Sequence, residues 1–156
     1  MKNTVIDDGT REYTISNQFG EEIRKLHFRP ADFSIAERFE KMKDEFIDAV
    51  RTLEKISVNA DGTAADSAEM DALHEADMKL RQSLNRLLDS NDADAIFRTR
   101  NPFSVVGGKF FAERVIDAIG QLIRAAVDEE AQASAERMSK YLESGGSDAG
   151  RPAADA

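Results

Sequence analysis

The sequence predicts a mainly α-helical protein with a three-helix core, a small N-terminal β-hairpin or three-stranded sheet, and a disordered C-terminal tail. Three observations predict this fold class. Apolar residues recur every three or four positions over three long segments, and short β-prone runs surround turn residues near the N-terminus. The last residues, 145–156, contain no large apolar side chain. A chain of 156 residues supports one hydrophobic core, so we expect residues 1–144 to form a single domain before the tail.

The hairpin is predicted close to the N-terminus. Thr4–Ile6 and Arg11–Ile15 flank Asp7–Thr10, whose Asp-Gly pair is typical of tight hairpin turns. A two-stranded hairpin is marginally stable alone, so it must pack on the rest of the chain. Glu21–Arg29 is a candidate third strand, because apolar and basic residues alternate over its second half before Pro30.

The first helix is predicted to run from a capping box at Ser34–Glu37 to about Ile56. Its apolar positions form one stripe, made of Phe39, Met42, Phe46, Val50, Leu53 and Ile56. If this stripe is core, replacing Phe39 or Phe46 by Ala costs roughly 3–5 kcal/mol of stability.

A second helix is predicted from an N-cap at Asp66 to the stop signal Asp89–Asn91. Its stripe comprises Met70, Leu73, Asp77, Leu80, Leu84 and Leu87. Asp77 interrupts this stripe, and Ala76 can replace it on a slightly wider face. Acidic residues come first along this helix and basic residues last, which complements the helix dipole.

A short helical turn is predicted over Asp92–Phe97, and a third long helix is predicted to begin near Lys109. The seam of this helix starts with Phe111, Val115, Ala118, Ile119, Leu122 and Ala126, and then drifts to Ile123, Val127, Ala131, Ala135, Met138 and Leu142. A single helix of about 35 residues is unusual in a small domain. Either it breaks near Asp128–Glu130, or its outer half projects and meets another chain.

Composition excludes several function classes. Charged residues make up 33% of the chain and the net charge is -9, whereas nucleic-acid binding needs a basic stripe. The absence of cysteine removes disulfides, thiolate nucleophiles and thiolate metal sites. Nothing approaches the roughly 20 apolar residues of a membrane span, and the N-terminus lacks a signal-peptide pattern. We therefore expect a soluble, intracellular protein with no nucleic-acid or membrane partner.

No motif predicts an enzyme. Gly107-Gly108-Lys109 lacks the glycine spacing and the Ser or Thr of a phosphate loop, and favours a flexible hinge or a helix start. His27 and His74 share no local motif and are interpreted as surface residues rather than metal ligands. We expect no catalytic residue, no cofactor and no metal.

The stretch Asp94–Phe111 is the best candidate for binding a partner. It holds four of the nine phenylalanines, an Asn-Pro turn and a Gly-Gly pair. Rings left outside the core would mark a protein-binding site. The candidate site residues are Phe97, Asn101, Pro102, Phe103, Gly107, Gly108, Phe110 and Phe111. A different surface, the acidic segment Asp61–Asp77, is a candidate for binding a basic partner, although a solvated helix face explains it more simply.

Several of these features together resemble the tail assembly chaperone-like proteins of long-tailed phages and prophages of Gram-positive bacteria. The features are the N-terminal hairpin, Phe28–Asp32, Arg38-Phe39, Phe97, Asn101-Pro102 and Gly107–Phe111. The resemblance spans roughly Val5 to Ala126, and departs from the family at Arg98, where many members have Gly.

The resemblance implies a non-enzymatic protein of the bacterial host cytoplasm. It would bind the helical tape-measure protein during virion assembly, with the major tail protein as a second partner. Two alternatives remain: a self-assembling phage structural protein that pairs through Ala131–Leu142, and an acidic inhibitor or nucleic-acid mimic centred on Asp61–Asp77.

Overall fold

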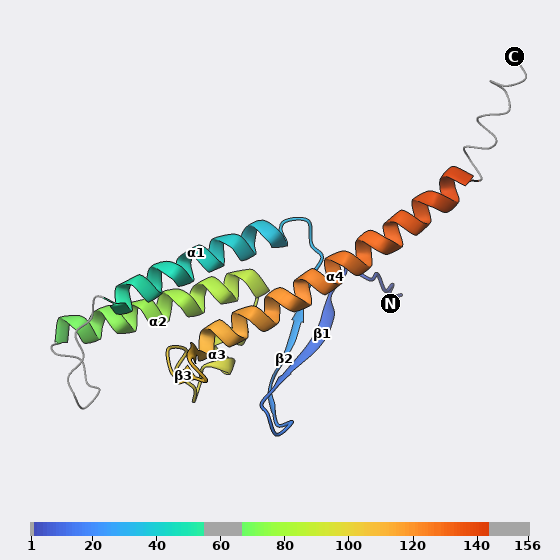
Figure 1. The fold of residues 1–156 in the computed structure, drawn as a ribbon. Helices are drawn as coiled ribbons and strands as arrows, with labels where there is room; N and C mark the ends of the chain where they lie inside the picture. Colours follow the sequence, from blue (N-terminus) through green and yellow to red (C-terminus); the bar gives the residue numbers. More distant parts are fainter. Residues whose placement is uncertain (1, 55–66, 144–156) are drawn as a thin grey trace, which may run out of the picture.

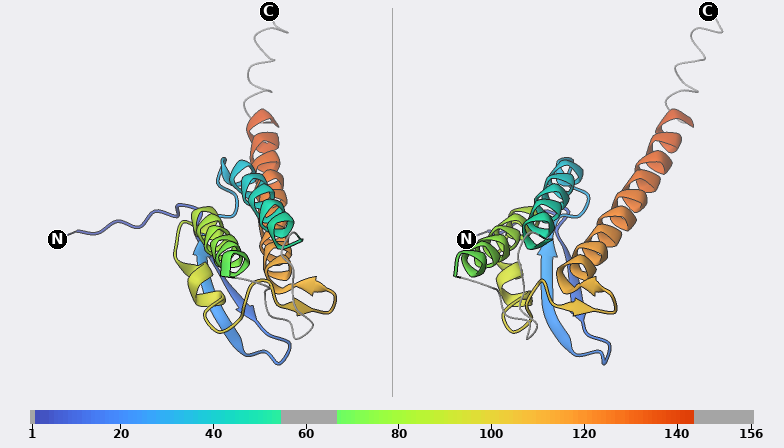
Figure 2. Two further views of the ribbon diagram at one scale, coloured as in Figure 1. Left: turned by 90° about the vertical axis from the view of Figure 1, so that its left-hand side faces the viewer. Right: turned by 60° about the vertical axis from the view of Figure 1, so that its left-hand side comes forward.

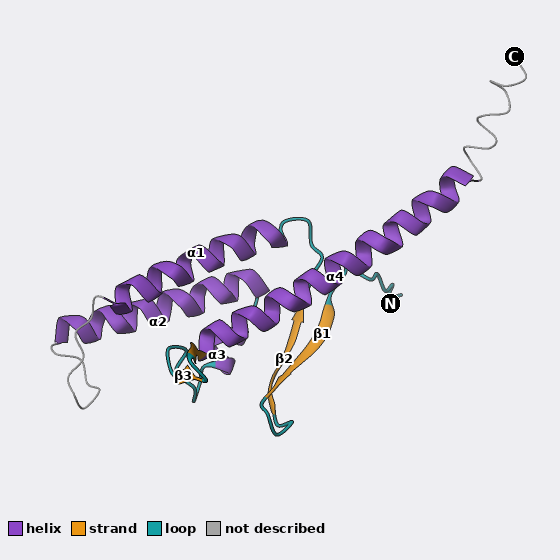
Figure 3. Cartoon of the chain, viewed as in Figure 1, coloured by secondary structure: helices purple, strands orange, loops and turns teal. Residues whose placement is uncertain are grey.

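The computed structural model describes residues 2–54 and 67–143. The elements follow in the order β1 (Arg11–Ser16), β2 (Glu22–Phe28), α1 (Ile35–Glu54), α2 (Ser67–Leu88), α3 (Asp92–Ile96), β3 (Val105–Val106), β4 (Lys109–Phe110) and α4 (Phe111–Tyr141). Helices α1 and α2 lie side by side and run in opposite directions, and the β1–β2 hairpin packs beside the first half of α4 (Figure 1). The predicted mainly helical fold with an N-terminal hairpin is confirmed (Figure 3).

The hairpin lies farther along the chain than predicted. Strands β1 and β2 pair antiparallel with Arg11 opposite Phe28, so the strand predicted as third is the second strand of a two-stranded sheet. The connection is Asn17–Glu21, where the Asn17 N–H donates to the Glu21 carbonyl at 2.9 Å. Gly20 adopts a φ of 79°, which glycine reaches without steric cost.

The predicted strand Thr4–Ile6 is wrong, and the Asp-Gly signal marks a local turn with no strand before it. The Gly9 N–H donates to Asp7 Oδ1 and the Thr10 N–H donates to Asp8 Oδ1, each at 2.9 Å. Aspartate side chains make such turns with their own backbone wherever they occur, so this signal does not require flanking strands.

Helix α1 begins where the sequence predicted. The Ser34 carbonyl accepts the first helical hydrogen bond, from the Arg38 N–H at 3.1 Å, which makes Ser34 the N-cap. Met42 is buried, whereas Phe39 and Phe46 are half-buried and pack against the edge of the core. Replacing either ring by Ala should therefore lower the free energy of unfolding by about 2–3 kcal/mol, which is less than the range predicted from the sequence.

Helix α2 buries a leucine face, and Ala76 takes the place of Asp77 on it. The Asp77 carboxylate instead accepts a hydrogen bond from Arg81 Nε at 2.8 Å, one turn along the helix. Met70, predicted to lie on the stripe, is exposed. The predicted cap Asp66 lies outside the described residues.

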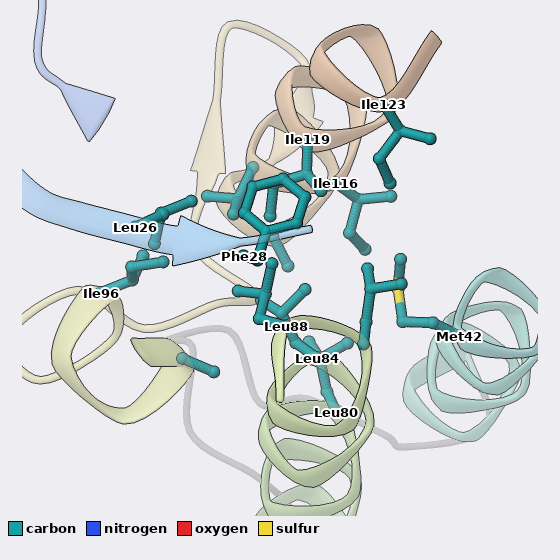
Figure 4. Close-up of a cluster of buried hydrophobic side chains, with 14 of the residues drawn as sticks. Leu26, Phe28, Met42, Leu80, Leu84, Leu88, Ile96, Ile116, Ile119 and Ile123 are labelled. Atoms are coloured by element: carbon teal, nitrogen blue, oxygen red, sulfur yellow. The ribbon is translucent and has the colours of Figure 1, made fainter. Parts of the chain in front are cut away.

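The core forms where β2 passes between the helices (Figure 4). Leu26 and Phe28 of β2 lie between leucines of α2 and isoleucines of α4, with Met42 and Ile96 at the sides. Fully buried leucines such as Leu84 fix the position of β2 and α4 on the α1–α2 pair.

Helix α4 is continuous over 31 residues, so of the two predicted alternatives the break near Asp128–Glu130 does not occur. One face of its first half is buried, at Val115, Ile116, Ile119 and Ile123, whereas Ala118, predicted on the seam, is exposed. Every described residue from Val127 onward is exposed. The outer half projects from the body of the molecule, as Figure 2 shows from two sides. The predicted tail, 145–156, lies outside the described residues.

Candidate docking surface

The stretch from Phe97 to Phe111 folds as a small hairpin that leads into α4. Strands β3 and β4 pair with Val105 opposite Phe110 and Val106 opposite Lys109. Gly107 and Gly108 connect them with φ values of 60° and 83°. Two successive positive φ angles define a type I′ turn, whose twist matches that of a hairpin. The glycine pair is therefore a hairpin turn, and the prediction of a hinge or helix start is corrected.

Backbone hydrogen bonds fasten this hairpin to the start of α4. The Phe111 N–H donates to the Ser104 carbonyl at 2.7 Å, and the Ala112 N–H donates to the Pro102 carbonyl at 2.8 Å. These bonds satisfy amides of the first turn of α4, which have no partner inside the helix. The Arg114 Nε also donates to the Val106 carbonyl, at 2.9 Å. The hairpin is therefore held to α4 both at its base and next to its turn.

Phe97 and Pro102 anchor the stretch in the core. Phe97 is 1% exposed, and its ring meets that of Phe111 edge to face with a centroid distance of 5.8 Å. The Arg81 guanidinium lies over the Phe97 ring and donates to the Phe97 carbonyl at 3.0 Å. Pro102 is fully buried. These two residues hold the hairpin in place and present no surface to a partner.

Apolar side chains remain on the outside of the hairpin. The half-buried rings of Phe103 and Phe110 meet edge to face at 5.9 Å. Val105, the cross-strand neighbour of Phe110, is 67% exposed and shares its face of the hairpin. We call Phe103, Val105 and Phe110 the hairpin patch. Val106 is also exposed, on the opposite face.

The sequence prediction placed Phe103 and Phe110 in the candidate site and omitted Val105. The signal that could have found it is Val-Val-Gly-Gly-Lys-Phe, in which a two-residue glycine turn separates short β-prone runs. Asn101 does form the predicted turn, since its Oδ1 accepts the Phe103 N–H at 2.9 Å. The partner-binding role of the eight predicted residues stays a prediction.

Two basic residues precede the hairpin patch in the sequence, although the chain is acidic as a whole. Arg98 is exposed and Arg100 is half-buried, and neither side chain forms an ion pair within the described ranges. Lys109 faces Asp117 at 3.5 Å. The two arginines therefore carry charges without an ion pair in the described ranges, a few residues before the hairpin patch in the chain.

A separate groove on the molecule is lined mainly by polar side chains. This groove of about 570 Å³ opens between the segment from Asp7 to Tyr13, the end of β2, and the middle of α4. Its arginines are already paired: Arg11 contacts Asp7 at 2.9 Å, and Arg29 contacts Asp32 at 3.6 Å. A hydrogen bond from Arg11 lowers the pKa of Asp7 below its ordinary value. This pairing leaves no free cationic group for an anionic ligand in the groove.

Among the described residues, neither histidine lies in a cluster of potential metal ligands. His27 is exposed on β2, with Nε2 2.8 Å from Glu12 of β1, and His74 is exposed on α2. The interpretation of both as surface residues is confirmed. Over residues 2–54 and 67–143, no group of three or more His, Cys, Asp or Glu side chains is arranged to hold a metal ion.

Comparison with known proteins gave no match: no family model fits this chain, and no curated protein or solved structure matches it significantly. In the part of the chain that the structure describes, no helix has both the length and the apolar character needed to cross a membrane.

Proposed function

We propose that this protein is a tail assembly chaperone, whose hairpin patch binds an amphipathic helix of the tape-measure protein in the host cytoplasm. The observation that carries the proposal is the hairpin patch itself, an apolar surface on a hairpin that hydrogen bonds fasten to α4, with Arg98 and Arg100 a few residues before it in the chain. The resemblance of Phe97, Asn101-Pro102 and Gly107–Phe111 to the phage family supplies the class of client.

The rigidity of the hairpin favours a docking role. Hydrogen bonds from Phe111, Ala112 and Arg114 hold its backbone. A surface that is already ordered loses little conformational entropy on binding. Val105 and the two rings can therefore contribute most of their buried apolar area to affinity.

The hairpin patch and the two arginines before it in the chain indicate the kind of helix that fits. A helix with apolar residues three and four positions apart would cover the hairpin patch. Carboxylates beside that stripe would face Arg98 and Arg100, and guanidinium–carboxylate hydrogen bonds add to both affinity and orientation. We therefore expect a client helix with one apolar stripe flanked by acidic residues.

Co-expression with the tape-measure protein tests the function. The chaperone should raise the soluble fraction of the tape-measure protein, because covering its apolar stripes prevents aggregation. Val105→Asp should lower this effect and weaken binding of a tape-measure helix at least tenfold, as measured by titration calorimetry. Met78→Asp is the matched control, since Met78 is 54% exposed and belongs to α2 rather than to the hairpin.

Two results would count against the proposal. If the tape-measure protein is equally insoluble with and without this chain, the chaperone function is wrong. If solubility rises but Val105→Asp behaves like Met78→Asp, the hairpin patch is the wrong surface. Arg98→Glu separates the electrostatic part, because its effect on affinity should shrink as salt concentration rises.

A further inference from the structure

The face of α4 that packs on α1 continues past the end of α1. Gly120 lies against Phe39 of α1, since a Cβ added at Gly120 would stand 2.8 Å from the end of that ring. Helix α1 begins at Ile35, near the middle of α4, and runs away from the projecting half (Figure 1). The same face of α4 beyond this point is uncovered (Figure 2).

That uncovered face carries an apolar stripe. We call it the α4 stripe; it consists of Val127, Ala131, Ala135, Met138 and Leu142. At 100° per residue these positions span about 80° of the helix circumference, and Gly120 points in the same direction. Val127, Met138 and Leu142 are 42%, 44% and 59% exposed. Isolated helices of this length are marginal in water, so packing on this stripe would stabilise the outer half.

One edge of the α4 stripe carries a negative charge near its start and a positive charge near its end. Glu130 and Arg137 both lie on that edge, about 60–80° from Val127. Arg137 has no carboxylate on its own helix at the positions three and four residues away, which are Ala133, Ser134, Lys140 and Tyr141. It also forms no ion pair elsewhere in the described ranges. Arg137 is therefore available to a carboxylate of another molecule.

We propose that the occupant of the α4 stripe is a second copy of this chain, with the two outer halves of α4 antiparallel. In this alignment Val127 lies opposite Leu142 of the second copy, and Ala131 lies opposite Met138. Ala135 lies next to its own symmetry mate, where small side chains let the helices approach closely. The face is thereby covered by helix, as Phe39 of α1 covers it at Gly120.

The charges select this orientation. An antiparallel pair places the same edge of both helices side by side, so Glu130 of each copy approaches Arg137 of the other, twice per dimer. A parallel pair would bring the acidic run Asp128–Glu130 of both copies together, and like charges at that distance repel. The antiparallel dimer satisfies Arg137, and the parallel dimer does not.

The contact is small, which sets its strength. The overlap from Val127 to Leu142 is about 24 Å long at 1.5 Å per residue. Two helices of that length bury less than the roughly 1,200 Å² of a standard stable interface. The dimer is therefore reversible and dissociates on dilution.

Sedimentation equilibrium over a range of concentrations tests the dimer. Arg137→Glu and Glu130→Arg should each raise the dimer Kd at least tenfold, and the double variant Glu130→Arg/Arg137→Glu should return it to within threefold of wild type. Glu129→Arg is the matched control, because the same charge change then falls on the opposite face of the helix and should leave the Kd unchanged.

Cysteine cross-linking tests the orientation, because the chain contains no cysteine of its own. Ala135→Cys should form a disulfide-linked dimer under mild oxidation. Val127→Cys alone should not, since the two sulfur-bearing positions would lie about 22 Å apart. An equal mixture of Val127→Cys and Leu142→Cys should cross-link. Circular dichroism confirms that each variant stays folded.

Several outcomes would overturn the proposal. If the wild-type chain sediments as a monomer up to about 1 mM, the proposed dimer does not form, because that concentration is well above the Kd expected even for a small interface. Cross-linking of Val127→Cys to itself would show a parallel pair. Failure of the double charge swap to restore association would reject the Glu130–Arg137 contact. If a tape-measure helix, and no second copy, protects Ala135→Cys from alkylation, the α4 stripe belongs to a client.

Discussion

The buried carboxylate of Asp92 is expected to contribute more to stability than any exposed carboxylate of comparable geometry. Asp92 is 6% exposed at the start of α3. Its Oδ1 accepts a hydrogen bond from Arg24 Nε at 2.8 Å, and its Oδ2 accepts one from Ser90 Oγ at 2.8 Å. The first bond joins β2 to α3 across the chain, so it fixes tertiary structure rather than a local turn.

The magnitude follows from the burial of the two partners. Hydrogen bonds to charged groups contribute about 1.5–3 kcal/mol each. The Arg24 side chain is 42% exposed, so water screens its interaction with Asp92 and the lower end of that range applies. The bond from Ser90 closes a local turn and adds less than the bond from Arg24. We expect Asp92→Ala to lower the free energy of unfolding by about 2 kcal/mol, equivalent to a fall in Tm of about 4–8 °C for a domain of this size.

Urea unfolding followed by circular dichroism measures this loss. Asp48→Ala is the matched control, because Asp48 sits on α1 with its side chain 74% exposed, 3.6 Å from Arg51. Exposed pairs of this kind contribute little. A double-mutant cycle of Asp92→Ala with Arg24→Ala should give a coupling free energy of about 1 kcal/mol.

The reasoning would be refuted if Asp92→Ala and Asp48→Ala unfolded at the same urea concentration. A coupling free energy of zero would also refute it, since the contribution of Asp92 to stability would then arise from its position in α3 and not from its bond with Arg24. Asp92→Asn gives a further check, because it keeps the size of the side chain and removes the charge.

Three other predictions concern the core, the hairpin turn and acid stability. Leu84→Ala, at a site 0% exposed, should cost about 3–4 kcal/mol in urea unfolding, while Met78→Ala, at an exposed site on the same helix, should change stability by less than about 0.5 kcal/mol. Gly107→Ala should cost about 1–2 kcal/mol, because φ is 60° there and the added Cβ would stand 2.5 Å from the Arg114 guanidinium; an unchanged Tm would contradict the type I′ turn. The Ser34 N–H bonds to Asp32 and lowers the pKa of that carboxyl below 3.8, so Asp32 stabilises the fold above this pH, and the contribution is lost as pH falls through the folded-state pKa. Asp32→Asn should therefore reduce the loss of stability between pH 5 and pH 2 in acid titrations followed by circular dichroism; an acid transition identical to that of the wild type would contradict this role.

The local sequence alone identified most of the helices. The three- and four-residue spacing of apolar side chains located α1 and α2, and the position of Ser34 located the start of α1, because both signals depend only on residues within one or two turns. The turn over Asp92–Phe97 was found for the same reason. The sequence analysis placed the hairpin too early in the chain, because Asp7–Gly9 forms the same local turn whether or not strands flank it.

The candidate site shows the same division. The clustering of aromatics, Asn-Pro and Gly-Gly drew attention to residues 97–111, but sequence could not decide which rings face outward. Burial of Phe97 depends on Arg81, sixteen positions earlier in the chain, while exposure of Val105 depends on how the hairpin sits on α4.

What the sequence by itself determined is therefore the mainly helical fold class and the approximate positions of the helices, since these follow from short-range periodicity and capping. Only the tertiary structure decided that α4 runs unbroken past the end of α1, that Asp92 is buried against Arg24, and that the hairpin patch and the α4 stripe face outward. Each of these depends on contacts between residues far apart in the chain, and the identity of a residue does not specify which distant side chain will cover it.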